Sequence, residues 1–471
     1  MSQVPLPLTL TATGGWLNRI SDGLVLAALA TISVSSAVFL PLPTSVRPLT
    51  PLLALSALIL LIVARRIAWR PVLEERSFQL LVLFSLFSLL VTVLALVSGG
   101  MPVLKGVTPL VGALKGFISL ALGIVVYVTI RVALCDRTRL RRGEVAIAIG
   151  MAVCVFAALI QVFATTGSEW AMNVTVWLTK VITVQINMEG YLSEGRVWGL
   201  AYEPSWMASA LGVALLPIAV TRALCEGGVV PWMTTALAFL GIGLSTSRGG
   251  LLLVFIVILI VFVWCCLPVA RGLSRDCRVR SCLLLTLFAV VMVGIANRSV
   301  IVRKLIEPTV HAQSDIMKKM NSAGLNFRVA SAQAAWETWL ERPIFGVGIG
   351  LSPWSIVERF PSWSLEAKDR REALLAIDRT AGPLPNPKNF FLRLLAETGI
   401  IGTAIYVSFL WCHRPVWTGR RLSASLLPLL ALAVVMADWL TLDSFALAGS
   451  WVALGWAALE SRGANEPEVV V

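Results

Sequence analysis

Four polar stretches of this hydrophobic chain carry side chains that could bind an anion or move a proton. They contain Arg196, Arg248, Arg328 and the pair Lys388-Asn389. Arginine offers a planar fork of donors that stays charged and suits two-point contacts to phosphate or carboxylate. The chemistry they favour is therefore the binding or transfer of an anionic group.

Arg248 is the most informative of these residues. Apolar residues flank the run Ser245-Thr246-Ser247-Arg248-Gly249-Gly250 on both sides. A guanidinium near membrane depth is costly and normally lines a polar cavity or meets an anion. The glycine pair lets the backbone turn tightly and approach a ligand. The alternative is an interfacial arginine that snorkels to the headgroups.

Arg196 opens a loop that ends at Glu203-Pro204. Proline suits the first helical position, so Glu203 is expected at the N-cap, where the helix dipole stabilises a carboxylate. Capping is a complete structural explanation of Glu203, and a role as proton acceptor is the alternative.

Arg328 precedes a pattern that predicts a helix with one apolar face. Its apolar members are Val329, Ala332, Trp336, Trp339 and Leu340, and Glu341-Arg342-Pro343 ends it. Such a helix could lie on the membrane surface or pack over the spans. Most of its residues, the tryptophans included, are expected to pack.

Asn386-Pro387 is typical of an N-cap and first helical position, which would place Lys388 in the first turn of the next helix. A cation there opposes the helix dipole, and a residue placed against local preference is a candidate for function. The alternative is an ordinary interfacial lysine.

The composition predicts an all-α polytopic membrane protein. The 471 residues are 57% hydrophobic and 14% charged, with a mean hydropathy of +0.84. A bilayer core of about 30 Å needs about 20 apolar residues per helix, which gives about twelve spans. They are expected near 23–42, 49–64, 78–98, 116–134, 146–166, 204–223, 232–247, 249–267, 281–297, 399–413, 425–438 and 442–459. The pair on either side of Arg248 could instead be one re-entrant hairpin.

The basic loops predict the orientation and the domains. Clusters of arginine follow spans two, four, eight and ten, which puts both termini in the cytoplasm. The chain then divides into residues 1–297 with nine spans, an outward loop domain at 298–398, and 399–471 with three spans and a tail. The net charge of +13 is explained by these loops and anionic lipid, without nucleic acid. The cysteines fall in spans or cytoplasmic loops, so no disulfide framework is expected.

Two further patterns carry little weight. Gly346-Val347-Gly348-Ile349-Gly350 does not follow a strand in a βαβ unit and faces away from ATP, so it is not interpreted as a nucleotide loop. His311 and His413 are assigned to opposite faces of the membrane, which excludes a histidine-based zinc site. We therefore expect no metal and no cofactor.

Several motifs in order resemble the O-antigen ligase/polymerase superfamily, which includes Wzy-type polymerases, WaaL-type ligases and O-linked oligosaccharyltransferases. They are the Arg196-Val-Trp-Gly199 and Ser247-Arg248-Gly249-Gly250 runs, the Arg328…Trp336…Arg342-Pro-Ile-Phe-Gly-Val-Gly348 run, and Asn389-Phe-Phe-Leu392…Glu397-Thr-Gly-Ile-Ile-Gly402. The resemblance covers residues 196–402 and implies a metal-independent, GT-C-like glycosyltransferase of the bacterial inner membrane. Its active site would face the periplasm.

The resemblance implies the partners and the roles of the site residues. The donor is a glycan on undecaprenyl pyrophosphate, held by Arg196, Arg248 and Arg328, and the acceptor is a sugar on a second lipid carrier or lipid A core. Glu203 and Lys388 are the candidate bases, with Arg248 and Arg196 counted as catalytic. Substrate-binding roles are expected for Arg328, Asn389, Arg342 and Trp336. Membrane lipids and a separate chain-length regulator are the other expected partners.

One departure favours a polymerase of O-antigen or exopolysaccharide. Ligases of the family carry an outward histidine just before the asparagine of the last motif, and here Lys388 stands in its place. A ligase that acts on lipid A core or protein is the alternative within the class. A transporter of lipid-linked sugar is the alternative of another class, but no internal repeat divides the chain into two similar halves.

Overall fold

The computed structural model describes residues 15–40, 47–64, 67, 69–185, 187–266, 279–280, 326–366, 370–415 and 422–463. Within these ranges the chain is helical, with isolated β-bridges and no longer strand. The helices are α1 (Gly15–Ala30), α2 (Leu49–Val63), α3 (Trp69–Leu73), α4 (Arg76–Val97), α5 (Pro109–Ala133), α6 (Arg137–Thr165), α7 (Glu169–Val181), α8 (Met188–Ser193), α9 (Pro204–Ser209), η2 (Ala210–Leu215), α10 (Leu216–Cys225), α11 (Val229–Ser245), α12 (Arg248–Cys266), α16 (Asn326–Glu341), α17 (Ser352–Arg359), η4 (Ser362–Glu366), α18 (Arg370–Ile377), α19 (Phe390–Trp411), α20 (Leu422–Trp439) and α21 (Ala448–Gly463).

The expected membrane character is confirmed. In the described ranges, five helical segments are long and apolar enough to cross a bilayer: Arg76–Val97, Pro109–Ala133, Arg137–Thr165, Pro204–Cys225 and Phe390–Trp411. Shorter apolar helices lie at Leu49–Val63, Val229–Ser245, Arg248–Trp264 and Ser425–Trp439. The span expected at 281–297 lies outside the described residues, as do His311 and the first part of the predicted loop domain.

The segments at both ends of the chain differ from the expected spans. Helix α1 ends at Ala30, and the Ser- and Thr-rich stretch after it forms turns and two β-bridges, Ser36 to Arg47 and Ala37 to Thr183. Helix α21 begins only at Ala448. Hydropathy alone marked both stretches as spans, but serine and threonine compete for backbone hydrogen bonds and favour turns and caps over helix interiors.

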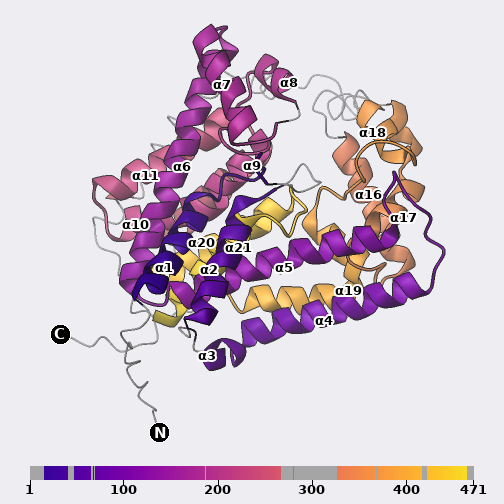
Figure 1. The fold of residues 1–471 in the computed structure, drawn as a ribbon, viewed down its shortest axis with the longest axis horizontal. Helices are drawn as coiled ribbons and strands as arrows, with labels where there is room; N and C mark the ends of the chain where they lie inside the picture. Colours follow the sequence, from indigo (N-terminus) through magenta and orange to yellow (C-terminus); the bar gives the residue numbers. More distant parts are fainter. Residues whose placement is uncertain are drawn as a thin grey trace.

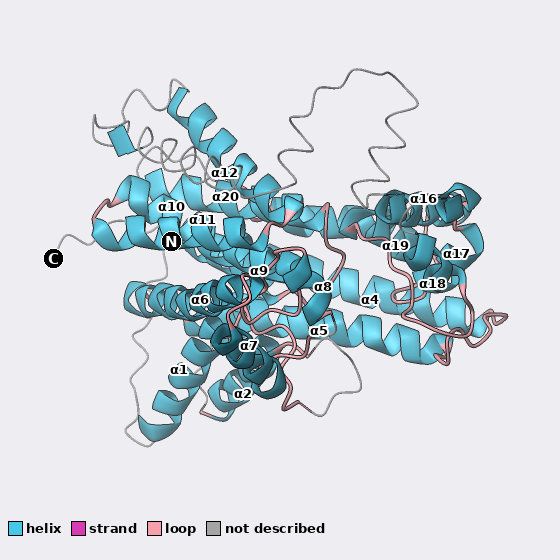
Figure 2. Ribbon diagram, turned by 90° about the horizontal axis from the view of Figure 1, so that it is seen from above, coloured by secondary structure: helices cyan, strands magenta, loops and turns pink. Residues whose placement is uncertain are grey.

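The helices form two connected parts (Figure 1). The continuous segment α9–η2–α10 is buried at the centre of one part, packed against α6, α11, α12, α20 and α21. In the other part, α4, α5 and α19 run side by side toward α16, α17 and α18, which gather at their far end (Figures 1 and 2). The α16–α18 group lies at the end of this helical layer.

Two separate helices surround Arg248. Helix α11 ends at Ser245, Thr246 takes a left-handed conformation with φ of 49°, and α12 begins at Arg248. Both helices pack on α9 as well as on each other.

The glycine run at 346–350 is a packing element. The Val347 and Gly348 N–H groups donate to the Ala396 and Glu397 carbonyls at 2.9 and 2.8 Å. A Cβ on Gly346 would lie 2.5 Å from the backbone of Glu397, and Gly346 has a φ of +74°. Only glycine allows this approach to α19, and α19 itself kinks at Gly399 with φ of 61°. The glycines therefore dock the α16–α18 group onto the helical layer.

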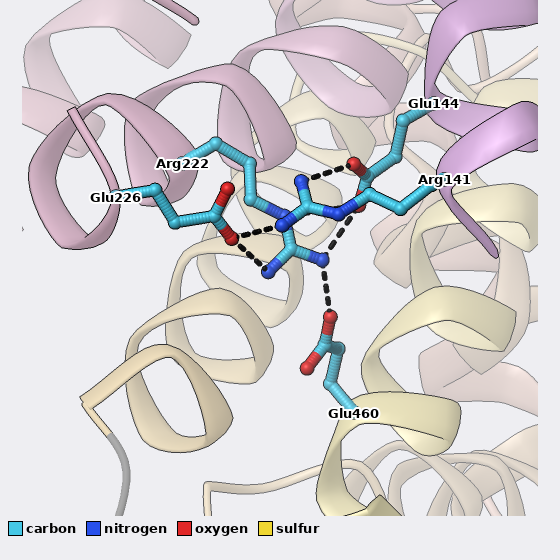
Figure 3. A network of polar contacts seen from close by, with 5 residues as sticks. All are labelled: Arg141, Glu144, Arg222, Glu226 and Glu460. Atoms are coloured by element: carbon cyan, nitrogen blue, oxygen red, sulfur yellow. Dashed lines mark hydrogen bonds and ion pairs between the residues drawn. The ribbon is translucent and has the colours of Figure 1, made fainter. Parts of the chain in front are cut away.

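A charge network centred on one nearly buried arginine joins three helices (Figure 3). The Arg222 side chain on α10 is 10% exposed and contacts Glu144 on α6 at 2.6 Å and Glu460 on α21 at 2.6 Å. It also contacts Glu226 at 3.2 Å, and Arg141 pairs with Glu144 and Glu226. We call these five residues the Arg222 network. Because each charge has an opposite partner, the network holds α6, α10 and α21 together.

Candidate active site

The buried side chain of Gln161 holds the loop that carries Arg196. The Gln161 Oε1 atom accepts hydrogen bonds from the N–H groups of Trp198 and Gly199 at 3.0 and 2.9 Å, and its Nε2 donates to the Gly199 carbonyl at 2.9 Å. Trp198 is fully buried, and Gly199 has a φ of 58° with no room for a side chain. The Arg196-Val-Trp-Gly199 motif thus anchors the loop through its later residues and leaves Arg196 to face the site.

Arg196 lies against Tyr191, a residue that no sequence motif singled out. Its guanidinium carbon is 5.3 Å from the centre of the Tyr191 ring, and it forms a 3.5 Å ion pair with Glu194. Arg196 Nε is buried and has no hydrogen-bond partner among the described residues. A buried cationic donor of this kind is costly unless a ligand or water satisfies it.

Glu203 occupies the N-cap position of α9, as predicted, but its carboxylate does not cap the helix. It accepts a hydrogen bond from the Ser205 hydroxyl instead. Burial, with the nearby Glu203 carboxylate adding to it, raises the pKa of Tyr191 to about 12. The Tyr191 phenol therefore stays protonated near neutral pH, beside both Arg196 and Glu203.

Small residues bring the start of α12 close to its neighbours. A Cβ on Gly249 would lie 2.8 Å from the Thr441 hydroxyl, and one on Gly250 would lie 2.6 Å from Ala208. The glycine pair therefore serves helix packing, and at the same time it presents Arg248, which is exposed, at the edge of the helical part.

Arginines from two other segments lie within electrostatic range of Arg248. The positive charges of Arg196 and Arg328 both act on the Arg248 guanidinium. We call Arg196, Arg248 and Arg328 the arginine cluster. Like charges held together repel each other, so the cluster creates a local positive potential that favours a multiply charged anion.

A short turn after α20 holds the remaining side chains in place. Arg328 Nη1 donates to the Thr441 carbonyl at 2.8 Å, and Asn389 Nδ2 donates to the Leu440 carbonyl at 3.3 Å. The Thr441 hydroxyl stabilises this turn by donating to the Asp438 carbonyl at 3.0 Å. The starts of α16, α19 and α12 therefore converge on the Leu440–Thr441 turn.

Lys388 lies outside the helix in which the sequence placed it. The N-cap of α19 is Asn389, whose side-chain oxygen accepts from the Leu392 N–H at 3.0 Å, and the helix begins at Phe390. The predicted N-cap at Asn386 is wrong because Asn389 satisfies the free N–H groups three residues later. Lys388 has a φ of 54° and is half-buried, so it does not oppose the helix dipole from the first turn.

Helix α16 buries a different face from the one predicted. Its buried residues are small or polar: Asn326, Ala330, Ser331, Ala334, Ala335 and Thr338. Val329, Trp336 and Leu340 are 42%, 44% and 55% exposed. Small side chains let α16 approach α17 and α19 closely, and the large apolar ones face outward.

The structure also separates two predicted substrate-binding residues from the cluster. Arg342 follows the last residue of α16, fourteen positions after Arg328, which is roughly 21 Å along a helix. Trp336 lies eight positions from Arg328, roughly 12 Å along the helix axis. Its ring packs on that of Trp339, with 4.6 Å between the ring centres. Within the described residues, no three His, Cys, Asp or Glu side chains lie close enough to hold a metal ion.

A buried hydrogen bond joins α9 to α20, and no sequence pattern indicated it. The Ser209 hydroxyl on α9 donates to the Asp438 carboxylate on α20 at 2.8 Å, and both side chains are buried. This bond links the helix that follows Glu203 to the turn that holds Arg328 and Asn389. Only a three-dimensional contact reveals it, because the two residues are 229 positions apart.

Comparison with known proteins agrees with the resemblance. No curated protein matches the chain. Residues 233–407 match the family model described as O-antigen ligase, a stretch that contains Arg248, Arg328, Lys388 and Asn389. Arg196 and Glu203 precede the matched stretch and join it only through the fold. The matched stretch of this chain is similar to the O-antigen ligase family, which supports the resemblance to the O-antigen ligase/polymerase superfamily.

Proposed function

We propose that the protein is a glycosyltransferase that polymerises oligosaccharide repeat units carried on undecaprenyl pyrophosphate, for O-antigen or exopolysaccharide. The observation that carries the proposal is the arginine cluster. The positive charge that Arg196 and Arg328 add near Arg248 suits a pyrophosphate, which is the leaving group of this reaction. The proposed location is the periplasmic face of the bacterial inner membrane, with a GT-C-like arrangement of spans.

The proposed reaction displaces the lipid pyrophosphate from the glycan. A sugar hydroxyl of the acceptor attacks the anomeric carbon of the donor glycan, and a new glycosidic C–O bond forms. The bond between that carbon and the pyrophosphate oxygen breaks, and its electron pair leaves with the undecaprenyl pyrophosphate. Negative charge grows on the leaving oxygen, so cations fixed beforehand stabilise the transition state. The Arg196, Arg248 and Arg328 guanidinium groups supply those cations.

The proton of the acceptor hydroxyl needs a destination. Lys388 is one candidate base, half-buried just before the start of α19. Glu203 is the other, and it lies beside Tyr191 and Arg196. A third possibility is that positioning of the acceptor supplies most of the rate and the proton passes to water.

The lysine at position 388 favours a polymerase over a ligase, since ligases of the family have a histidine there. The description of the matched family favours the ligase instead. In a polymerase the acceptor sits on a second lipid carrier, with a separate regulator of chain length, whereas in a ligase it is lipid A core or a protein.

The test is the reaction of the purified full-length protein in liposomes with its lipid-linked repeat unit. We expect a ladder of longer lipid-linked glycans, abolished by Arg248→Ala and retained by Arg139→Gln, a half-buried arginine on α6 that pairs with Asp136. Transfer only after lipid A core is added would make the protein a ligase. Movement of intact lipid-linked sugar across the bilayer, with no new glycosidic bond, would make it a transporter and overturn the proposal.

A further inference from the structure

A groove on the surface of the molecule lies away from the arginine cluster. It runs between α1 and α6 and has a volume of about 840 Å³. The helices meet where Gly150 lets the backbone of α6 touch that of α1 at Ala30. Ten residues line the groove: Leu26, Ala27, Ala30, Arg137, Thr138, Arg141, Arg142, Val145, Ala146 and Ile149.

The lining is divided by chemistry along α6. The first six positions of the helix supply three arginines and a threonine to the lining, and the apolar residues follow, with Val145 and Ile149 57% and 58% exposed. The twelve helical steps from Arg137 to Ile149 span roughly 18 Å, close to the depth of one leaflet of a bilayer about 30 Å thick. An apolar channel of this length with cations at one end matches an acyl chain with an anionic headgroup.

The three arginines at the N-terminal end of α6, which line one end of the groove, differ in their partners. Arg141 is held by Glu144 and Glu226, so the Arg222 network fixes one wall of the groove (Figure 3). Arg137 and Arg142 are exposed, and they add positive charge where a headgroup phosphate would lie. Each basic residue near a membrane surface strengthens binding of anionic lipid.

We propose that the α1–α6 groove binds an anionic phospholipid, with its phosphate at Arg137 and Arg142 and an acyl chain along Leu26, Ala30 and Ile149. Contacts to both helices would fasten α1, which packs mainly on α2 and α6, to the rest of the helical core. The site is separate from the proposed transfer chemistry, and it needs neither donor nor acceptor glycan.

The test uses the full-length protein in liposomes with a photoactivatable phosphatidylglycerol that carries its reactive group on the acyl chain. We expect crosslinks to α1 and α6, and about fivefold weaker capture for each charge removed in Arg137→Gln and Arg142→Gln. Arg139→Gln is the matched control, because Arg139 lies between them in sequence, pairs with Asp136 at 3.1 Å and does not line the groove. Its capture should equal that of the wild type.

Two further arms make the result decisive. Ala27→Phe fills the groove without changing charge and should abolish the crosslinks to Ile149. A phosphatidylcholine probe of the same acyl chain should be captured several-fold less. Equal capture of both probes, equal loss in Arg139→Gln, or displacement by undecaprenyl phosphate but not by phosphatidylglycerol would each overturn the proposal.

Discussion

Arginines gather at two places in this molecule, and their surroundings are opposite. In the Arg222 network, a nearly buried guanidinium contacts three carboxylates at 2.6–3.2 Å. In the arginine cluster, the charges of Arg196 and Arg328 act on an exposed Arg248, and backbone carbonyls hold Arg328. One place neutralises its arginines with the chain's own acids. The other concentrates positive charge at the surface.

The comparison shows how a structural charge differs from one available to a ligand. A buried ion is tolerated only when opposite charges and hydrogen bonds compensate its lost hydration. A group of like charges is tolerated at an exposed edge, where water or an anion can screen it. The number of arginines in each stretch of sequence does not distinguish the two places. What distinguishes them is how deeply the arginines are buried and whether carboxylates pair with them.

The largest expected effect is on stability, from Arg222→Leu. It leaves the nearly buried carboxylates of Glu144 and Glu460 without their shared cation, so we expect a loss of about 3–5 kcal/mol in the free energy of unfolding. Thermal or denaturant unfolding in detergent measures it. Arg139→Gln, at a partly exposed pair, should change it by less than about 1 kcal/mol. A stable Arg222→Leu protein would show that the network does not hold the helices.

The next effect is on rate, from Arg248→Ala. Loss of one preorganised cation at the leaving pyrophosphate should lower turnover by about 10²–10³-fold, with unfolding unchanged because Arg248 is exposed. Arg248→Lys should recover only part of the rate, since lysine lacks the two-point fork. Single-turnover transfer from the lipid-linked donor is the measurement. Full recovery with lysine would mean that charge alone matters there.

The two candidate bases should separate in their pH profiles. The variant that removes the base, Lys388→Gln or Glu203→Gln, should lose about 10²-fold in rate. It should also lose the rise in rate that the wild type shows as pH increases through the titration of the base. The other variant should keep that rise. If both variants keep the wild-type rate and profile, neither side chain is the base.

The smallest effect is expected from Arg342→Ala. Arg342 is exposed and lies roughly 21 Å along α16 from Arg328, so the rate and the free energy of unfolding should change by no more than about 0.5 kcal/mol, about twofold in rate. The same transfer assay measures it. A loss as large as that of Arg248→Ala would extend the anion site to the far end of α16 and erase the contrast between the two arginines.

The sequence by itself determined the class of the protein and the residues most worth testing. Long apolar runs require helices in a bilayer, because every backbone polar group must be satisfied within its own segment. The cost of an arginine between apolar runs identified Arg248, and the order of the motifs identified the superfamily. These signals are local, so they could be read without any knowledge of packing.

Only the tertiary structure decided which of those residues meet. Arg328 reaches the carbonyl of Thr441, 113 positions away, and Arg196 joins the cluster from outside the matched family stretch. The buried face of α16 and the corrected cap of α19 have the same origin. Close packing favoured alanines over tryptophans on the buried side, and one side-chain hydrogen bond moved the helix start from Asn386 to Asn389. Such outcomes depend on which distant segments pack together, and hydropathy patterns carry no information about that.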